Sequence, residues 1–207
     1  YFVDARQKLH LSQLFAVSRE AGYLSAENDF KHCPFGVILK KDGKPFKTRD
    51  GADVKLRDVI EEAVSRARDL VNAKNPELDD AARGRVAEVV GVGAIKYAEL
   101  SKNRTTDYIF DWDTMLSFEG NTAPYLQYAY TRIRSLFRRA GIERLDPATP
   151  ILLTAPQELA LAIKTLQFNE AIANYLEDYQ ANILCNYLYE LAGLFMSFYE
   201  HCPILTE

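Results

Sequence analysis

The first 43 residues combine two short apolar runs with one helical pattern. Residues 1–4, YFVD, are typical of the end of a buried strand, and residues 35–43, FGVILKKDG, contain a second short strand. Between them, residues 6–22 carry apolar side chains at helical spacing, and Gly22 stands where this helix is expected to end. The side chains expected to face inward from the helix are Leu9, Leu11, Leu14, Phe15 and Val17.

Two longer helical patterns occupy the middle of the chain. Residues 53–72 and 82–102 each hold apolar side chains on one face, and the turn NPELDD separates them. Gly91 and Gly93 are expected to weaken the second helix, because glycine has a low helix propensity. Residues 105–118 alternate apolar and acidic side chains, so we expect an extended or strand-like segment there.

From residue 120 onward the pattern is helical. Residues 121–141 form one predicted helix, which begins with Asn121 or Thr122 as its cap and ends near Gly141. The segment DPATP that follows has the composition of a linker. A helix with proline in its first turn and glycine at its end follows the usual asymmetry of helix termini.

Two further helices complete the pattern. Residues 154–179 are predicted as one helix that starts with Thr154 and Gln157 in capping-box spacing. Residues 181–202 are apolar almost throughout, which is typical of the central helix of a bundle and not of a surface helix. The predicted fold class is therefore mainly α with a small α/β part at the N-terminal end.

Composition narrows the class of protein. The 207 residues are 48% hydrophobic and 26% charged, as in an ordinary globular protein, and we find neither a membrane-length apolar run nor a signal peptide. Three cysteines far apart, without a CxxC pair, favour free thiols in a reducing cytosol. Two His-Cys pairs, at 32–33 and 201–202, lack the close spacing of metal sites, so we expect no metal.

The loop GKPFKTRDG places three cations between two glycines in a chain of net charge −4. Lys44, Lys47 and Arg49 are spaced to match a polyphosphate, and flanking glycines allow the backbone to approach a ligand closely. A solvated hairpin is the alternative, and the loop alone does not separate the two.

Polar side chains also follow the first predicted strand. In an open parallel sheet, ligands bind beyond the carboxyl ends of the strands, and Asp4, Gln7 and His10 lie in or just after that position. The alternative for Asp4 is that it only caps the following helix.

The helix 122–140 combines aromatic and basic side chains. Tyr125, Tyr128 and Arg132 lie on one face, at positions i, i+3 and i+7. Aromatic rings stack on unpaired bases and arginines neutralise phosphates, so this face is a candidate RNA-binding surface. A solvated bundle helix is the alternative. A local basic stripe binds RNA despite a negative total charge, because partners respond to the nearby field.

Three long strings carry a resemblance to a known family. GKPFKTRDG, GAIKYAELSKNRTTDYIFDWDTMLSFEGNTAPYLQYAYTRIRSLFRRA and LYELAGLFMSFYEHCPIL resemble bacterial arginyl-tRNA synthetase, and the resemblance runs from end to end. It implies the end of a class I Rossmann-like catalytic domain over residues 1–50, a connecting region over 51–119, and an incomplete helical anticodon-binding domain over 120–207. Because both ends look cut, we expect a fragment that is inactive alone.

The resemblance also assigns roles to the cationic loop. Lys44-Pro45-Phe46-Lys47-Thr48 aligns with the class I KMSKS loop, which closes over ATP. By this likeness Lys47 offsets the charge that develops on the phosphates, with help from Lys44 and Thr48. Pro45 and Phe46 depart from the family's Met and Ser, so the hinge mechanics of the loop are expected to differ.

Further roles follow from the same resemblance. It makes Gln7 a candidate for the arginine pocket and His10 a candidate for the nucleotide side, while Tyr125 and Tyr128 match positions near the anticodon loop, with Arg132 beside them. The implied partners are tRNA(Arg), L-arginine and ATP with Mg²⁺, in a cytoplasmic protein that we expect to be a monomer. The alternative function is a non-catalytic helical tRNA-binding module.

Overall fold

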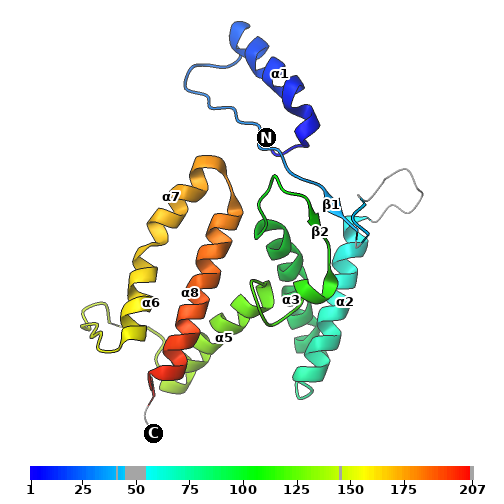
Figure 1. Ribbon diagram of the computed structural model, residues 1–207. Helices are drawn as coiled ribbons and strands as arrows, with labels where there is room; N and C mark the ends of the chain where they lie inside the picture. Colours follow the sequence, from blue (N-terminus) through cyan, green and yellow to red (C-terminus); the bar gives the residue numbers. More distant parts are fainter. Residues whose placement is uncertain (41, 45–54, 145, 206–207) are drawn as a thin grey trace.

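The structure is a computed structural model that describes residues 1–40, 42–44, 55–144 and 146–205. Its helices form two groups that stand side by side, with a separate N-terminal helix projecting from them (Figure 1). This confirms the mainly α fold class with a small α/β part. The elements are a 3₁₀ turn (Ala5–Gln7), α1 (Lys8–Glu20), β1 (Ile38–Leu39), α2 (Leu56–Lys74), α3 (Asp80–Leu100), β2 (Tyr108–Ile109), α4 (Trp112–Met115), α5 (Ala123–Ala140), α6 (Pro156–Leu166), α7 (Phe168–Asp178) and α8 (Ala181–His201).

The two strands β1 and β2 pair in parallel, with Ile38 opposite Tyr108 and Leu39 opposite Ile109. The strand expected in 35–43 is thus confirmed in a short form, and the extended segment expected in 105–118 reaches only two residues before α4 begins. Asp111 starts this short helix by accepting a 2.9 Å hydrogen bond from the backbone nitrogen of Thr114. A capping carboxylate therefore stops the extended run.

The buried strand expected at residues 1–4 is wrong. Phe2 forms only an isolated parallel bridge with Cys33, and its side chain is 61% exposed. The apolar pattern is real, but the ring remains mostly exposed, and the Arg104 guanidinium lies 5.7 Å from its centre.

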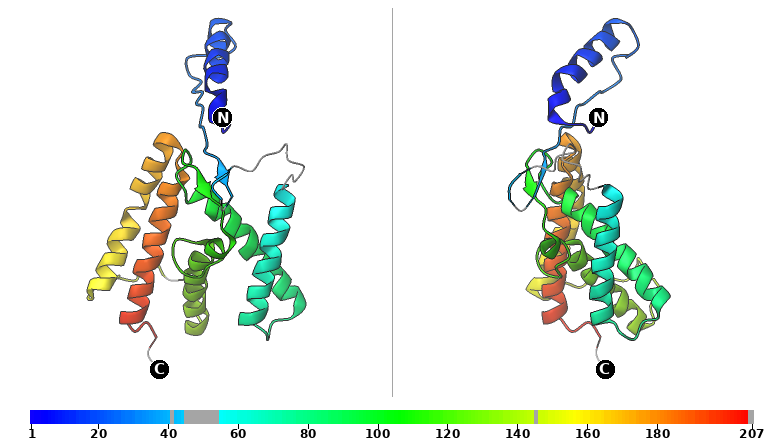
Figure 2. Two further views of the ribbon diagram at one scale, coloured as in Figure 1. Left: turned by 45° about the vertical axis from the view of Figure 1, so that its right-hand side comes forward. Right: turned by 90° about the vertical axis from the view of Figure 1, so that its right-hand side faces the viewer.

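Helix α1 forms where the sequence predicts it and is followed by Gly22 in the left-handed conformation, with φ +75°. Its inward face is narrower than expected, because only Leu11 and Phe15 are buried. Leu9, Leu14 and Val17 are exposed. Phe15 packs on the rings of Tyr1 and Phe30, each 5.4 Å away, while α1 itself stands clear of the helical body in three views (Figures 1 and 2).

Helices α2 and α3 form an antiparallel hairpin that is packed through small side chains. Ala63, Ala67 and Ala87 are completely buried between them. A Cβ atom on Gly91 would lie 2.8 Å from the backbone of Ala63, so only glycine permits this helix separation. α3 runs through Gly91 and Gly93 without a break, and Gly91 allows the two helix backbones to pack closely.

The remaining helices form the bundle. α8 lies against α5, α6 and α7, which confirms its predicted central place (Figure 2). Thr122 caps α5 by accepting a hydrogen bond from the backbone nitrogen of Tyr125, and Gly141 ends α5 with φ +66°, both as predicted.

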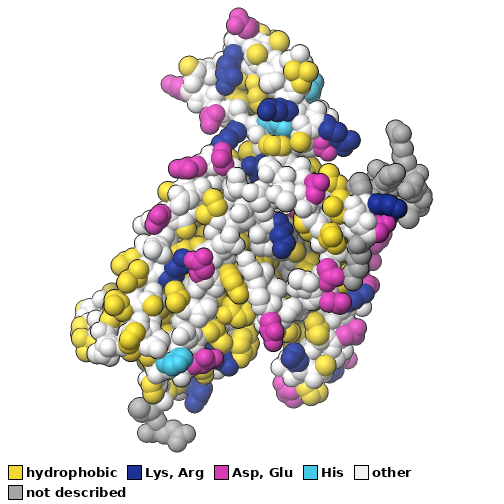
Figure 3. Space-filling model, in the orientation of Figure 1, with side chains coloured by type: hydrophobic (Ala, Val, Ile, Leu, Met, Phe, Trp, Pro, Cys, Tyr) yellow, Lys and Arg dark blue, Asp and Glu magenta, His cyan; other side chains and the backbone are white. Residues whose placement is uncertain are grey.

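Figure 3 shows hydrophobic side chains gathered on the outward side of α6 and α7. No helix of the described residues has the length and apolar character to cross a bilayer.

The single helix expected over 154–179 is wrong, because the chain breaks at Gln167 into α6 and α7. The Tyr187 hydroxyl donates a 2.9 Å hydrogen bond to the carbonyl oxygen of Lys164, which also accepts from the Gln167 nitrogen. A partner from α8 therefore takes part in the turn. The capping residue is Glu158 and not Gln157, since its carboxylate accepts hydrogen bonds from the nitrogens of Thr154 and Ala155 at 2.6 and 2.8 Å.

The glycine contact gives a first prediction. Replacing Gly91 with alanine (Gly91→Ala) is expected to destabilise the protein by about 1–3 kcal/mol, because the new methyl group meets backbone atoms that cannot move aside independently. Gly84→Ala, in the same helix but with open space around the added Cβ, is the control and is expected to stabilise by about 0.5–1 kcal/mol. Urea unfolding followed by circular dichroism measures both. Equal shifts in the two variants would contradict the close packing.

Candidate nucleic-acid interface

The candidate RNA-binding face lies on α5 where this helix meets the end of α8. Thr122 fixes the start of α5 and so sets which side chains point away from the core. Tyr128 is 40% exposed, whereas Tyr125 is half-buried and its ring meets Tyr189 edge-on at 5.5 Å. Burial raises the pKa of the Tyr125 hydroxyl, with a smaller contribution from Tyr189. The two tyrosines therefore differ: one serves mainly the core, the other faces outward.

Arg132 is held between two aromatic rings. Its guanidinium carbon lies 4.8 Å from the centre of the Tyr128 ring and 4.6 Å from that of Tyr199 on α8. Such cation–π contacts hold a long side chain in one place while its charge stays available. The structure brings together Tyr128 and Arg132, as the sequence predicted, and adds Tyr199 from α8.

A separate groove lies near the end of α5, and at 3.6 residues per turn its side chains stand on the side of the helix opposite Tyr128 and Arg132. It is lined by two arginines, a phenyl ring and one carboxylate. Arginines supply phosphate contacts and the ring offers a stacking surface. The side chains and backbone positions that line it are Arg134, Phe137, Arg138, Gly141, Ile142 and Glu143.

The cationic loop is described only at its start. Gly43, with φ +74°, closes a turn in which its nitrogen donates to the Lys40 carbonyl at 2.9 Å. After this turn the carbonyl oxygen of Lys44 accepts a 2.8 Å hydrogen bond from the nitrogen of Lys40. The Lys44 ammonium lies 3.8 Å from the Asp42 carboxylate, and 78% of the Lys44 side chain is exposed. Lys47 and Thr48 lie outside the described residues.

The predicted ligand residues near the N-terminus are exposed. Asp4 accepts hydrogen bonds from the backbone and side chain of Arg6, and the side-chain contact in particular lowers the pKa of Asp4 to about 2. Its capping role is therefore present. Gln7, at the end of the 3₁₀ turn, and His10, in α1, are both exposed and stand well away from the α5 face, so the structure does not bring these two groups of candidates together (Figure 1).

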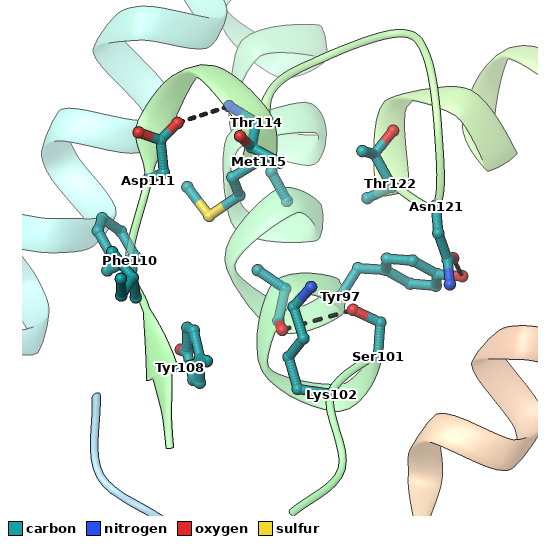
Figure 4. Close-up of a pocket in the computed structure, with 14 residues that line it drawn as sticks. Tyr97, Ser101, Lys102, Tyr108, Phe110, Asp111, Thr114, Met115, Asn121 and Thr122 are labelled. Atoms are coloured by element: carbon teal, nitrogen blue, oxygen red, sulfur yellow. Dashed lines mark hydrogen bonds between the residues drawn. The ribbon is translucent and has the colours of Figure 1, made fainter. Parts of the chain in front are cut away.

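Sequence reasoning missed a polar junction between α3, the start of α5 and α8. The Tyr97 hydroxyl lies 2.6 Å from Asn121 Oδ1 and 3.0 Å from the carbonyl oxygen of Cys185, and Asn121 donates onward to Asn186 at 3.1 Å. Burial is the main reason that the pKa of Tyr97 is raised, so this hydroxyl stays protonated. The junction borders a small cavity of about 110 Å³, in which Tyr97, Asn121 and Tyr108 come from three different elements (Figure 4).

No group of three or more metal-ligating side chains occurs among the described residues. The cysteines are free thiols; Cys33 and Cys185 are buried, and Cys202 is partly exposed.

Comparison with known proteins gives this geometry a context. The sequence profile described as "tRNA synthetases class I (R), catalytic domain" matches residues 1–112, and the profile "DALR anticodon binding domain" matches residues 126–207. The chain belongs to the class I arginyl-tRNA synthetase family. The α5 face described above thus lies almost wholly in the part of the chain that resembles an anticodon-binding domain.

Relatives and solved structures agree with the family. The chain is 54% identical over all 207 residues to "Arginine--tRNA ligase" of Cellvibrio japonicus, of which it covers 36%, and 55% identical to that of Sodalis glossinidius. The arginyl-tRNA synthetase of Plasmodium falciparum matches the whole chain with 28% identity and a TM-score of 0.78, over 35% of its own length. That of Thermus thermophilus matches 84% of the chain with 32% identity, a TM-score of 0.71 and 28% of its own length covered. The chain thus spans about 36% of the curated relatives.

The polar junction generates a prediction. Tyr97→Phe removes the single hydroxyl proton that Asn121 Oδ1 and the Cys185 carbonyl oxygen share, which leaves the partly buried junction one donor short, so the free energy of unfolding should fall by about 1–3 kcal/mol. Tyr23→Phe, at a side chain that is 85% exposed, is the matched control and should change it by less than about 0.5 kcal/mol. Urea titration compares them, and an unchanged Tyr97→Phe midpoint would show that the junction contributes nothing.

Proposed function

We propose that the full-length protein is an arginine–tRNA ligase, which activates arginine with ATP and esterifies it to tRNA(Arg). One observation carries the proposal: relatives with this name are 54% identical over the entire chain, without a gap in coverage between its two regions. Within that reaction, this chain contributes the cationic loop at one end and the helical RNA-binding bundle at the other. We further propose a cytoplasmic monomer that uses Mg²⁺ together with ATP.

The division of the chain follows from this function. We propose that residues 1–50 complete a catalytic domain and that residues 120–207 bind the anticodon region. Residues 51–119 connect these two parts. Gln7 is proposed for the arginine pocket and His10 for the nucleotide side. Their exposure on α1 supports these assignments, because a side chain must be accessible to meet a ligand.

We propose that the cationic loop acts on the transition state. As the arginine carboxylate attacks the α-phosphorus, the bond to pyrophosphate breaks and negative charge grows on the departing phosphates. Lys47 offsets that charge, assisted by Lys44 and Thr48, and the benefit is larger in the transition state than in bound ATP. The exposed, weakly paired ammonium of Lys44 supports a side chain that is free to turn toward a ligand.

The loop assignment predicts the effect of Lys47→Ala in the full-length protein. Arginine-dependent ATP–pyrophosphate exchange, measured with tRNA present, should fall about 10²–10³-fold, because one preorganised cation is lost from the transition state. Lys55→Ala, at the exposed start of α2, is the control and should retain activity within about twofold. An unchanged rate for Lys47→Ala would remove the loop from the mechanism. Absent exchange in the unmodified protein would instead favour a non-catalytic tRNA-binding module.

The α5 face predicts a separate effect on RNA binding. Tyr128→Ala should weaken tRNA binding by about 1–3 kcal/mol, since a stacking ring is lost and Arg132 loses one of its two supports. Tyr23→Ala is the control, because this tyrosine is 85% exposed in the segment that follows α1 and lies outside the helical bundle. Filter binding across a salt series measures both, and equal affinities for wild type and Tyr128→Ala would leave that ring only a packing role.

A further inference from the structure

The C-terminal end of α7 is held by two cations from distant parts of the chain. Lys31 donates to the carbonyl oxygen of Glu177 at 2.6 Å and to the Asp178 carboxylate at 2.8 Å. Arg104, from the loop before β2, donates to the carbonyl oxygen of Asp178 at 2.9 Å. These residues stand 146, 147 and 74 positions from their partners, so the contact joins the N-terminal region to the bundle.

The sequence of α7 explains why this end needs outside partners. The last carbonyl groups of a helix have no partner within it, and the helix dipole concentrates negative charge there. The last turn of α7 contains no basic residue and instead ends in Glu177 and Asp178, which add further negative charge. Lys31 and Arg104 supply the missing positive charge from outside the helix.

Two details show that the contact is built from several groups. Arg104 uses a second guanidinium nitrogen to bond the Pro34 carbonyl, so its planar fork links two segments at once in a fixed geometry. Tyr179, which follows α7, adopts a left-handed conformation with φ +53°, and its ring lies 5.5 Å from the Lys31 ammonium. A non-glycine residue in that conformation costs about 1–2 kcal/mol, which the surrounding contacts must offset.

Because this contact lies at one end of the bundle, a small rotation there displaces the other end. The α7–α8 turn lies beside the N-terminal segment and the loop before β2 in every view (Figures 1 and 2). Tyr97 meets α8 nearby, at Cys185, whereas the aromatic support of Arg132 comes from Tyr199. Fourteen helical residues separate Cys185 from Tyr199, or about 21 Å at 1.5 Å per residue. A rotation of about 10° at the attachment therefore moves the RNA-binding face by about 4 Å.

We propose that Lys31 and Arg104 are positioning residues, which hold the helical bundle at a fixed angle to the catalytic region by binding the end of α7. The proposal rests on the proposed function, since a fixed angle matters when one tRNA must reach both regions. Misplacement of reacting groups by about 1 Å costs up to 10²-fold in rate. Loosening the attachment should therefore uncouple RNA recognition at α5 from the reaction.

The test uses the double variant Lys31→Met and Arg104→Met in the full-length protein, which keeps a long unbranched side chain and removes both charges. We expect kcat/KM for tRNA aminoacylation to fall at least tenfold. Discrimination between native tRNA and a transcript with a substituted anticodon should shrink at least fivefold. Arginine-dependent ATP–pyrophosphate exchange at saturating tRNA should stay within twofold.

Three comparisons make the outcome decisive. Lys31→Arg, which keeps the donor, should retain wild-type discrimination, and Arg68→Met should do the same, because Arg68 pairs with Asp80 inside the α2–α3 hairpin. Lys31→Met alone should also reduce the discrimination between the two tRNAs, by a smaller factor. This single variant tests the proposal if the double variant does not fold. Unchanged anticodon discrimination in the folded double variant, or an equal loss in Arg68→Met, would overturn the proposal.

A distance measurement separates this inference from the proposed activity. Spin labels at Arg57→Cys on α2 and Glu170→Cys on α7, both exposed, report the angle between the two regions. The distance distribution should broaden in the double variant and not in Arg68→Met. An unchanged distribution would overturn the positioning role even in an active enzyme. A broadened one would support it even if wild-type protein shows no exchange, which would count against the proposed function alone.

Discussion

The arrangement of this protein depends on how the helical bundle is attached to the rest of the chain. Apolar packing is non-directional, so two helical groups that meet through hydrophobic surface alone can slide or rotate. Polar ties remove that freedom, because a hydrogen bond works only over a narrow range of distance and angle. Tyr97 and Asn121 provide such a tie to α8, and Lys31 and Arg104 provide another to α7. Both occur near the α7–α8 turn, so the far end of the bundle follows whatever angle they set.

On α5, core packing and the proposed RNA recognition share one helix. Tyr125 turns its ring toward Tyr189 and the core, whereas Tyr128, one turn later, reaches the surface and supports Arg132. A guanidinium held between two rings has already lost much of its side-chain freedom, which reduces the entropy that RNA binding would cost. The negative net charge of the chain does not oppose this, since surface charges more than about 8–10 Å away are largely screened at physiological salt.

Close contact between backbones decides the other half of the molecule. Gly91 lies against the backbone of Ala63, and Gly36 lies against that of Thr106 beside the two-stranded sheet. The first approach sets the separation of α2 and α3, and the second holds together the segments that lead into β1 and β2, after which the cationic loop begins. The start of that loop is therefore positioned by rigid elements, while its exposed lysine side chain remains free of strong pairing.

Local features were determined by the sequence alone: most helices, the Thr122 cap, the stops at Gly22 and Gly141, the central place of α8, and the family itself. These depend on side chains within a few residues of one another, which the printed order of residues contains. Tertiary structure alone decided the exposure of Phe2 and Leu9, the break at Gln167, the burial of Tyr125 and the attachment of α7 by Lys31 and Arg104. Each of these depends on a partner, or on the lack of a covering layer, far away in sequence. Periodicity records which side chains are apolar but not which element comes to cover them.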